Sequence, residues 1–569
     1  MSELQNIFNL KQIPVLFGLI IGILLCGCAN TKHYTRGPVK VFDPDTSAIP
    51  QPEQVDRSRY WEQLNYTLFH QLRKPLNLNT VGRSAGMVLG ISEPREADNI
   101  NVLDEPPESS WYNYRHFYNP MTLEELANGP NETAPPDTTG NWTIFQASIG
   151  GPNAWFFIED RKGDRYLIKF DSPDFPELRT SSEVISTKFF HAAGYNVPEA
   201  TITYLNPSKF TIKDSVMVRE GRRRREMTQA DIKNTLLERP RNRFGKVRTI
   251  AIKFVEGTPI GPWGFEGTRD DDPNDRVAHE HRRELRGLRV ISSWLNDTDR
   301  RDANSLAVYT EGGYVKHYLQ DFGSTLGANG AGVHTPIDGQ AYLIDPRYMA
   351  LNTLSLGMNV NVWEKDQAIT PFPSVGYFRS DIFEPEEWVT AHPLPAFENM
   401  TLRDAYWGAK QVMSFSDEDI RRIVKTGRIT NGEAQSFLWQ ILINRRDKIG
   451  EYWFSRINPL DKFRAEITNG DLVLHFVDLG VEGNIFRADN TRYRYEVFAG
   501  NKQVLKARGT EENRAIFNIA GIKQTSSEAS RVINFRLYTE REDIGYKPVK
   551  VYVALEKSGP RIVGVNREQ

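Results

Sequence analysis

Five polar side chains stand at the edges of predicted elements, where they could carry chemistry. Lys169 ends a predicted strand, and Glu183 lies fourteen residues later in the first turn of a predicted helix. Asp299 and Asn304 are five residues apart in an acidic segment, and Asp321 opens an Asp-Phe-Gly sequence. The oxygen atoms of Asn304 and Asp321 are hard ligands of the kind that Mg²⁺ prefers. Together these residue types could hold a divalent cation and neutralise the charge of an anionic group.

The elements expected to hold Lys169 and Glu183 can be recognised in the sequence from Trp142 onward. The segments WTIFQAS, AWFFIED and RYLIKFD predict three strands, joined by turns that contain glycine. A helix is expected next, with Ser181 or Ser182 as its N-cap and Gly194 as its stop. Two further strands, ATITYL and TIAIKFVEG, flank a charged insertion from Lys213 to Lys246.

The later candidates need a second set of elements. A helix is expected from about His279 to Leu295, followed by two short strands, SLAVY and YVKHYLQ, on either side of a glycine turn. From about residue 386 to 453 the pattern predicts mainly helices, with well-marked starts at Thr401 and at Ser416.

The order of these features resembles the protein-kinase-like superfamily. Lys169 matches the strand-three lysine, Glu183 the helix-C glutamate, residues 296–304 the catalytic loop, and Asp321 the start of the metal-binding Asp-Phe-Gly. The loop is most similar to those of phosphatidylinositol 3-/4-kinases and HipA-type kinases, which place an Asp five residues before an Asn. The resemblance covers roughly residues 142 to 455, and the ordered set is more specific than any single motif in it.

The resemblance implies ATP and Mg²⁺ as ligands. Lys169 would hold the α- and β-phosphates and would be oriented by Glu183. Gly150 and Gly151, in the turn after the first strand, would let the backbone approach the phosphates closely.

The resemblance also implies a base and two metal ligands. Asp299 would accept the proton of the attacking hydroxyl, and Asn304 and Asp321 would bind the metal. Asp297 or Asp302 could share or replace the role of Asp299, so the base stays open among these three residues.

Two departures from the family pattern leave a structural alternative. The turn IGGPN does not match G-x-G-x-x-G, and Arg301 stands where the lipid kinases carry His. In the alternative, Lys169 is an exposed strand lysine and Glu183 a helix-start carboxylate favoured by the helix dipole. The acidic loop would then be a solvated turn.

The beginning of the chain predicts an anchor. Residues 13–27 form an unbroken apolar stretch, shorter than the roughly 20 residues that span a bilayer but suited to a signal peptide. The stretch ends in Leu25-Cys26-Gly27-Cys28, which resembles the lipobox of bacterial lipoproteins. That resemblance implies a covalent lipid on Cys28, and Ala29 after it implies the outer membrane. The alternative is an uncleaved N-terminal membrane helix.

Composition excludes some classes of function. Lys and Arg number 71 against 73 Asp and Glu, so no charge bias points to nucleic acid as a partner. The chain has 2 cysteines, Cys26 and Cys28. Removal of the first and acylation of the second would leave no free thiol and no disulfide.

We therefore predict an α+β protein, with a two-lobed protein-kinase-like domain followed by a C-terminal all-β immunoglobulin-like sandwich. The sandwich is predicted from short alternating strands after Asn458. The expected divisions are a lipoprotein signal peptide (1–27), a tether (28–60), an N-terminal extension of unknown fold (61–141), an N-lobe (142–260), a C-lobe (261–457) and the β-sandwich (458–569).

Two functions remain for an exported lipoprotein anchored to the cell envelope and facing the periplasm. One is an atypical kinase-like phosphotransferase that uses Mg-ATP or a related phosphate ligand. The other is a catalytically inactive, pseudokinase-like binding or scaffold protein, which export favours because a bacterial periplasm holds little ATP. In either case the lipid would bind the membrane, and the sandwich could bind a protein or an envelope polymer.

Three weaker signals are interpreted structurally. Ser84 lies in a G-x-S-x-G match to serine hydrolases, but the short polar segment before it is unlike the buried strand that the motif needs, so we favour a chance match. The run Arg222 to Arg225 predicts an exposed loop, with an acidic partner or anionic lipid as the functional option. His279 and His281 lack the spacing of zinc-binding helices and predict an exposed helix start.

Overall fold

The computed structural model describes residues 39–56, 59–71, 94–149, 153–220, 223–345, 361–500, 502–510, 513–519 and 532–568, with short pieces at 349, 352–355 and 358. The chain divides into two compact units, Met1–Pro38 with Leu72–Arg95 and Val39–Gln71 with Glu96–Gln569. Every element below belongs to the second unit. Within the described ranges, no helix combines the length and apolar character needed to cross a bilayer.

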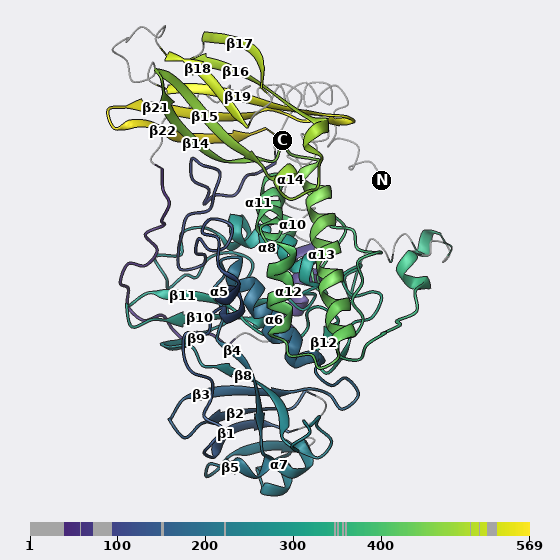
Figure 1. Cartoon of the computed structure of the whole chain (residues 1–569). Helices are drawn as coiled ribbons and strands as arrows, with labels where there is room; N and C mark the ends of the chain where they lie inside the picture. Colours follow the sequence, from purple (N-terminus) through teal and green to yellow (C-terminus); the bar gives the residue numbers. More distant parts are fainter. Residues whose placement is uncertain are drawn as a thin grey trace, which may run out of the picture. The chain divides into compact units, whose positions relative to one another are not determined.

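A six-stranded sheet carries Lys169 (Figure 1). Its strand order is β4-β8-β3-β2-β1-β5, and the strands are β1 Trp142–Ser148, β2 Trp155–Glu159, β3 Arg165–Phe170, β4 Ala200–Leu205, β5 Phe210–Ile212 and β8 Val247–Lys253. The strands predicted from the alternating pattern are confirmed. Lys169 pairs with Trp155 of β2 on one side and Ile250 of β8 on the other, so its backbone is fixed from both sides.

Helix α6, Leu178–Ala192, follows β3 and begins earlier than predicted. Its N-cap is Glu177, so the prediction of Ser181 or Ser182 in that role is wrong. The carboxylate of Asp171, just after β3, accepts hydrogen bonds from the backbone N–H and the hydroxyl of Thr180 at 2.9 and 2.8 Å. This long-range cap satisfies a first-turn donor that a local serine would otherwise serve.

The charged insertion folds into regular elements. A hairpin of β6 Met217–Glu220 and β7 Arg223–Glu226 precedes α7, Gln229–Leu236. Arg225, part of the predicted exposed loop, lies on β7 and donates two hydrogen bonds of 2.7 Å to Asp231. A strand therefore replaces the expected loop over the described part of this basic run.

A second sheet and a set of helices carry the remaining candidates. The sheet has the order β11-β10-β9, with strands β9 Thr258–Gly261, β10 Ser305–Tyr309 and β11 Val315–Leu319, and β12 Ala328–Asn329 pairs separately with β13 Gly332–Val333. The helices are α8 Arg283–Leu295, α10 Pro395–Glu398, α11 Leu402–Met413, α12 Asp417–Lys425 and α13 Gly432–Phe454. Figure 1 shows α8, α11 and α13 packed side by side. The predicted helix starts at Thr401 and Ser416 are confirmed, each with a capping box.

The segment before α8 differs from its prediction. His279 belongs to a short 3-10 turn, His279–His281, and is buried rather than exposed. Its Nε2 atom lies 2.7 Å from Asp275, and its ring packs edge-on against Trp111. Tertiary packing thus overrides the polar appearance of this helix start.

Part of the segment before Trp142 belongs to the central core. Its elements are α2 Arg59–Leu64, a π-helical turn Asn65–His70 and α5 Leu123–Asn128. Trp111, Tyr112 and Leu126 pack in one hydrophobic cluster with Leu288 of α8 and Trp407 of α11.

The C-terminal region is rich in β-strands. One sheet has the order β14-β15-β18 and the other β17-β16-β19-β21-β22, with β20 paired to β19. The strands are β14 Leu460–Thr468, β15 Asp471–Asp478, β16 Thr491–Ala499, β17 Lys502–Thr510, β18 Arg514–Asn518, β19 Val532–Arg541, β20 Ile544–Gly545, β21 Val549–Glu556 and β22 Gly559–Arg567, with a short helix α14, Leu479–Glu482. Both sheets contribute to one core, which includes Leu474, Val497 and Val551.

Candidate functional site

Lys169 joins three elements in one ionic cluster. Its Nζ atom lies 2.9 Å from Oε2 of Glu183 on α6 and 2.7 Å from Oδ1 of Asp321, two residues after β11. The side chains of Lys169 and Glu183 are 5% and 2% exposed, whereas that of Asp321 is 45% exposed. Lys169 is thus not an exposed strand lysine, and the open side of the cluster is at Asp321.

Glu183 holds both the lysine and the Asp-Phe-Gly segment. Its Oε2 atom contacts Lys169, and its Oε1 atom accepts a hydrogen bond of 2.8 Å from the backbone N–H of Phe322. Phe322 is fully buried, and its ring stacks on Phe190 of α6 with 4.8 Å between centroids. One buried carboxylate and one buried ring therefore fix the backbone that carries Asp321.

Asp321 is held as an ionised carboxylate in a strained backbone. Its φ of 58° lies in the left-handed region, which costs a non-glycine residue of order 1–3 kcal/mol and is often found at functional sites. Burial alone would raise the pKa of this carboxyl, but the charges of Lys169 and then Arg179 outweigh it and lower the pKa well below its usual range. An ionised carboxylate is the form that binds a cation.

Arg179 is a second cation in the cluster, and the sequence analysis did not identify it. It lies one turn before Glu183 on α6 and is buried, and its Nε and Nη1 atoms have no hydrogen-bond partner among the described residues. A Cβ atom at Gly323 would lie 3.1 Å from both Arg179 Nε and Glu183 Oε2, so the guanidinium borders the Asp-Phe-Gly segment. The four-residue spacing from Glu183 is the sequence signal that could have found it.

Asp297 has a structural role in the loop. It is buried, and Nε of Arg300 donates to it at 2.8 Å. Burial raises the pKa of Asp297 to about 6, against the opposing effect of Arg300. The Nη1 group of Arg300 also donates to the carbonyls of Asn304 and Gln320, at 2.7 and 2.9 Å, and so ties the loop to the chain before Asp321.

Asp302 is also enclosed. The hydroxyl of Tyr66 donates to its carboxylate at 2.8 Å, and the backbone N–H of Phe265 donates at 3.2 Å. Its own backbone N–H donates to Glu62 of α2 at 2.7 Å. These contacts engage Asp302 with the N-terminal segment and leave Asp299 as the accessible carboxylate of the three.

Asp299 and Asn304 lie together, as their spacing predicts. The Nδ2 atom of Asn304 donates to the carbonyl of Asp299 at 2.6 Å and to its carboxylate at 3.2 Å. Asp299 is 32% exposed, and Arg301 forms an ion pair with it at 3.3 Å. Burial raises the pKa of Asp299, Arg301 opposes that rise, and the nearby charge of Asp321 adds to it. The last effect places Asp299 within electrostatic reach of the Lys169 cluster.

Three predicted residues fall outside this description. Gly150 and Gly151 fall in the sequence between β1 and β2, and Cys28 falls in the N-terminal stretch; all three lie outside the described residues. Their predicted roles stay predictions.

The donor set fits a nucleotide-bound Mg²⁺ better than a metal held by protein alone. Within the described ranges, no group of three or more His, Cys, Asp or Glu side chains could hold a metal ion. Asn304 and Asp321 would supply one amide and one carboxylate oxygen, and Mg²⁺ usually completes its shell with phosphate oxygens and waters. Arg179, whose buried Nε and Nη1 atoms lack a partner in the described part of the chain, and Lys169 are two cations that would suit phosphate oxygens.

Comparisons with known proteins give little further information. No protein-family model matches the chain, and no curated protein matches it in sequence. Among solved structures, it is similar to one described as the crystal structure of the Golgi casein kinase with Mn/ADP bound. The two share 10% sequence identity at a TM-score of 0.27, over 73% of this chain and 94% of that chain. A likeness this weak assigns neither a fold family nor a function.

Proposed function

We propose that this protein is an atypical, kinase-like phosphotransferase that binds Mg-ATP or a related phosphate ligand. One observation carries the proposal: buried Lys169 bridges Glu183 on α6 and the half-exposed carboxylate of Asp321. Buried Lys410 also pairs with two carboxylates, Glu105 and Asp461, but both of those are largely enclosed, at 12% and 11% exposed. Two carboxylates from distant elements, one of them open to solvent, suit a lysine that meets phosphates on that side.

Each residue then has a defined part. Lys169, oriented by Glu183, and Arg179 would neutralise charge on the phosphates. Asp299, whose raised pKa suits a proton acceptor, would take the proton of the attacking hydroxyl. Asn304 and Asp321 would hold Mg²⁺, which when bound supplies charge neutralisation at the phosphate oxygens.

An assay with ATP labelled at the γ-phosphate, on the full chain purified in detergent, tests phosphoryl transfer. We expect Mg-dependent labelling of the protein or of added acceptors by the unmutated chain. Asp299→Asn should abolish labelling while ATP still binds, because the base contributes to the transfer step and not to phosphate binding. Full labelling by Asp299→Asn would contradict its assigned role.

A second candidate is a binding protein that keeps the nucleotide pocket without transfer. The ion pair between Arg301 and Asp299 favours it, because a paired carboxylate is less available as a base. Saturable ATP binding by the unmutated chain without any labelling would support this candidate. Absence of ATP binding would exclude both candidates.

Localisation belongs to the same proposal. A lipid on Cys28 would anchor the protein to the cell envelope, facing the periplasm, and the C-terminal strands, proposed as an immunoglobulin-like sandwich, would bind a protein or envelope polymer. Mass spectrometry of the N-terminal peptide of the mature protein tests the anchor: we expect an acylated Cys28 that Cys28→Ser removes. An unmodified Met1 in the purified protein would contradict it.

A further inference from the structure

A cavity lies beside α6, with residues of β4 and α12 also in its wall. It has a volume of about 290 Å³ and is lined in part by Val184 and Lys188 of α6, Thr201 of β4, Arg422 of α12 and Arg428 of the loop after it. Val184 and Lys188 are four residues apart and share a helix face, whereas Glu183 and Arg179 share another. The cavity is therefore separate from the Lys169 cluster, although both use α6.

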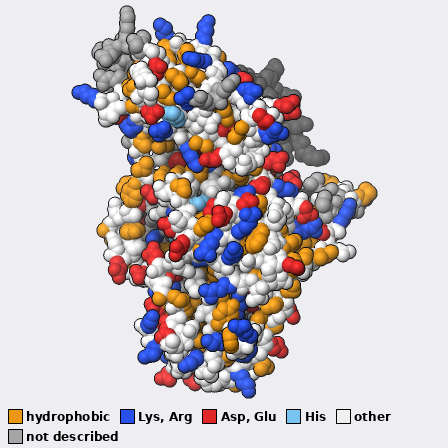
Figure 2. All heavy atoms as spheres, in the orientation of Figure 1, with side chains coloured by type: hydrophobic (Ala, Val, Ile, Leu, Met, Phe, Trp, Pro, Cys, Tyr) orange, Lys and Arg blue, Asp and Glu red, His pale blue; other side chains and the backbone are white. Residues whose placement is uncertain are grey.

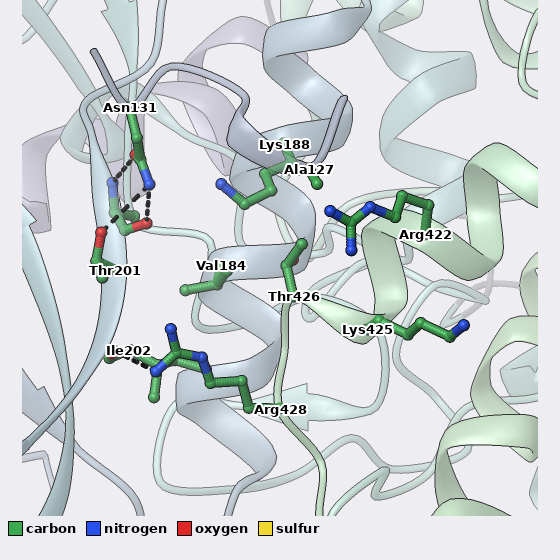
Figure 3. A pocket seen from close by; sticks show the side chains of 11 residues that line it. Ala127, Asn131, Val184, Lys188, Thr201, Ile202, Arg422, Lys425, Thr426 and Arg428 are labelled. Carbon is green, nitrogen blue, oxygen red and sulfur yellow. Dashed lines mark hydrogen bonds between the residues drawn. The ribbon is translucent and has the colours of Figure 1, made fainter. Parts of the chain in front are cut away.

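Cations dominate the wall of this cavity. Lys188, Arg422, Lys425 and Arg428 line it, and its lining includes no Asp or Glu. Figure 3 shows Lys188 pointing toward the side of Asn131 and Thr201, Arg422 reaching in from α12, and Lys425 extending away from the others. Figure 2 shows Lys and Arg side chains gathered over the face where Figure 1 places α12 and α6.

The cations inside the wall meet only backbone carbonyls in the described part of the chain. Lys188 donates to Asn128 at 2.8 Å, Arg422 to Leu123 at 3.3 Å and Arg428 to Ile202 at 3.2 Å. Among the described residues, no carboxylate forms an ion pair with Lys188, Arg422 or Arg428. A carbonyl carries only a partial charge, so its contact does not neutralise the buried ammonium of Lys188, whereas the exposed guanidinium groups of Arg422 and Arg428 can also meet water.

Lys188 shows the cost of this arrangement. The residue is 3% exposed. Burial, and then the charge of Arg428, lower its pKa to about 8. An ammonium has three donors, and one hydrogen bond to a carbonyl leaves two that an oxyanion could accept.

Helix electrostatics explain only part of the cluster. Arg422 and Lys425 lie in the last turn of α12, where cations are favoured by the helix dipole. Lys188 lies inside α6, and Arg428 follows α12 with a φ of 48° in the left-handed region. The dipole gives no reason for these two cations to share a cavity.

We propose that this cavity binds the phosphate group of a small ligand through Lys188, Arg422 and Arg428. A phosphate carries up to two charges and offers three acceptor oxygens, which match an ammonium and two guanidinium groups. The volume is near the lower end of ligand pockets, roughly 300–1,000 Å³, so the ligand is compact. The proposal does not rest on the proposed function, because the two sites share none of these residues.

The test is calorimetric titration of the full chain with pyrophosphate in the presence of a chelator, which removes divalent cations. We expect saturable binding that weakens at least about tenfold in the double variant Arg422→Gln/Arg428→Gln, because each lost charge-assisted hydrogen bond is strong. Both arginines are exposed, so their replacement should leave folding intact. Lys188→Met should weaken binding as well and is checked for folding by its melting temperature.

A matched control makes the outcome specific. Lys506→Gln/Arg508→Gln removes two exposed cations from β17 and should leave binding unchanged. The proposed function is tested separately, by titration with Mg-ATP, and that site includes none of Lys188, Arg422 and Arg428, so failure here and failure of the proposed function are distinguishable. Absence of saturable binding, or equal binding by the Arg422/Arg428 variant, would overturn the proposal.

A second arm identifies the source of the phosphate. Vesicles of phosphatidylcholine with phosphatidic acid are added as competitors of pyrophosphate. If the vesicles displace pyrophosphate from the unmutated chain but do not bind the Arg422/Arg428 variant, the ligand of the cavity is a lipid headgroup. Displacement by free glycerol phosphate alone assigns a soluble phosphate compound.

Discussion

Lys169 and Glu183 form an ion pair of 2.9 Å that is almost closed to water. Removing one partner of such a pair leaves an uncompensated buried charge, which costs about 3–5 kcal/mol. Lys169→Met should therefore lower the melting temperature by several degrees as well as remove nucleotide binding. Differential scanning calorimetry measures the first effect. Lys162→Met, in the exposed turn before β3, is the matched control, and equal melting temperatures for the two variants would contradict the assigned burial.

Arg179 should behave in the opposite way. Its buried Nε and Nη1 atoms have no hydrogen-bond partner among the described residues, so replacing Arg179 removes a charge without breaking a hydrogen bond from either atom. We expect Arg179→Met to keep or raise the melting temperature while weakening Mg-ATP binding about ten- to hundredfold, the worth of a charge-assisted hydrogen bond. Isothermal titration calorimetry measures the affinity.

The control for Arg179 is Arg165→Met on β3. Arg165 is 57% exposed and pairs with Glu159 at 3.2 Å, and such surface pairs contribute little. Arg165→Met should leave ATP affinity unchanged. Equal affinities for both arginine variants and the unmutated chain would exclude Arg179 from phosphate binding.

The sequence predicted some residues of the candidate site and missed others, and the reasons are physical. Lys169, Glu183 and Asp321 could be predicted to lie together, because their order and the strands and helix beside them were recognisable in the sequence. Arg179 was missed, because a charged residue near a helix start is ordinarily solvated, although its four-residue spacing from Glu183 pointed to the same helix face. The choice of Asp299 over Asp297 and Asp302 also needed the structure, since burial and long-range partners separate the three.

Helix α2 docks on the loop that carries Asp299. Glu62 of α2 is buried and accepts a hydrogen bond from the backbone N–H of Asp302 at 2.7 Å. Burial, and then the charge of Asp302, raise the pKa of Glu62 to about 7 from 4.5. The carboxyl group of Glu62 thus binds a proton more tightly when α2 is docked than when it is not. Docking is most stable below about pH 4.5 and weakens as the pH rises to about 7, by up to about 3 kcal/mol.

Amide hydrogen exchange over Arg59–His70, corrected for the intrinsic pH dependence of exchange, measures this docking. The unmutated chain should open more readily at pH 8 than at pH 5. Glu62→Gln keeps an acceptor for the N–H of Asp302 but cannot ionise, so its opening should not vary with pH in this range. The same pH slope in both proteins would contradict the shifted pKa.

Element boundaries were predictable where local signals decide them. The capping boxes at Thr401 and Ser416 are local, and both helices start there. The start of α6 depends on a hydrogen bond from Thr180 to Asp171 of the preceding segment, and the serine residues nearby in the sequence do not indicate this bond. The regular structure of the charged insertion goes with the burial of Val218, Met227 and Ile232 in the core of the six-stranded sheet, which composition alone does not predict.

The C-terminal strands are fastened to the helical part by buried charges. Arg567, at the end of β22, is 3% exposed; its Nη2 atom lies 2.9 Å from Asp461 and its Nη1 atom donates to the carbonyl of Leu460 at 2.7 Å. Asp461 in turn accepts hydrogen bonds from Tyr406 and Lys410 of α11 at 2.7 and 3.2 Å. Arg567→Met should lower the melting temperature of this region by about 10 °C, since breaking a buried pair costs about 3 kcal/mol or more.

Scanning calorimetry with limited proteolysis measures this effect. Arg561→Met is the matched control, because Arg561 is 48% exposed and pairs with Glu556 at the exposed end of the same hairpin. The control should change the melting temperature by no more than about 2 °C, as expected for a surface pair. A control effect as large as that of Arg567→Met would contradict the fastening role.

For the whole molecule, the sequence predicted a mixed α+β protein with a β-rich C-terminal region, and this is what the structure has. Alternating strands and amphipathic helices report such classes reliably. The packing of Trp111 and Tyr112 with Leu288 and Trp407 in one core was not predictable, because no periodic pattern marks that irregular segment.

The central claim is that Lys169, Asp321 and their neighbours form a Mg-nucleotide site. Calorimetric titration of the full chain with ATP, with Mg²⁺ or with a chelator, tests it most directly. We expect saturable ATP binding whose affinity falls at least about tenfold without Mg²⁺ and in the Asp321→Asn variant. Asp174→Asn, in the exposed loop after β3, is the control and should leave the affinity unchanged. No ATP binding, or equal binding in all four measurements, would contradict the claim.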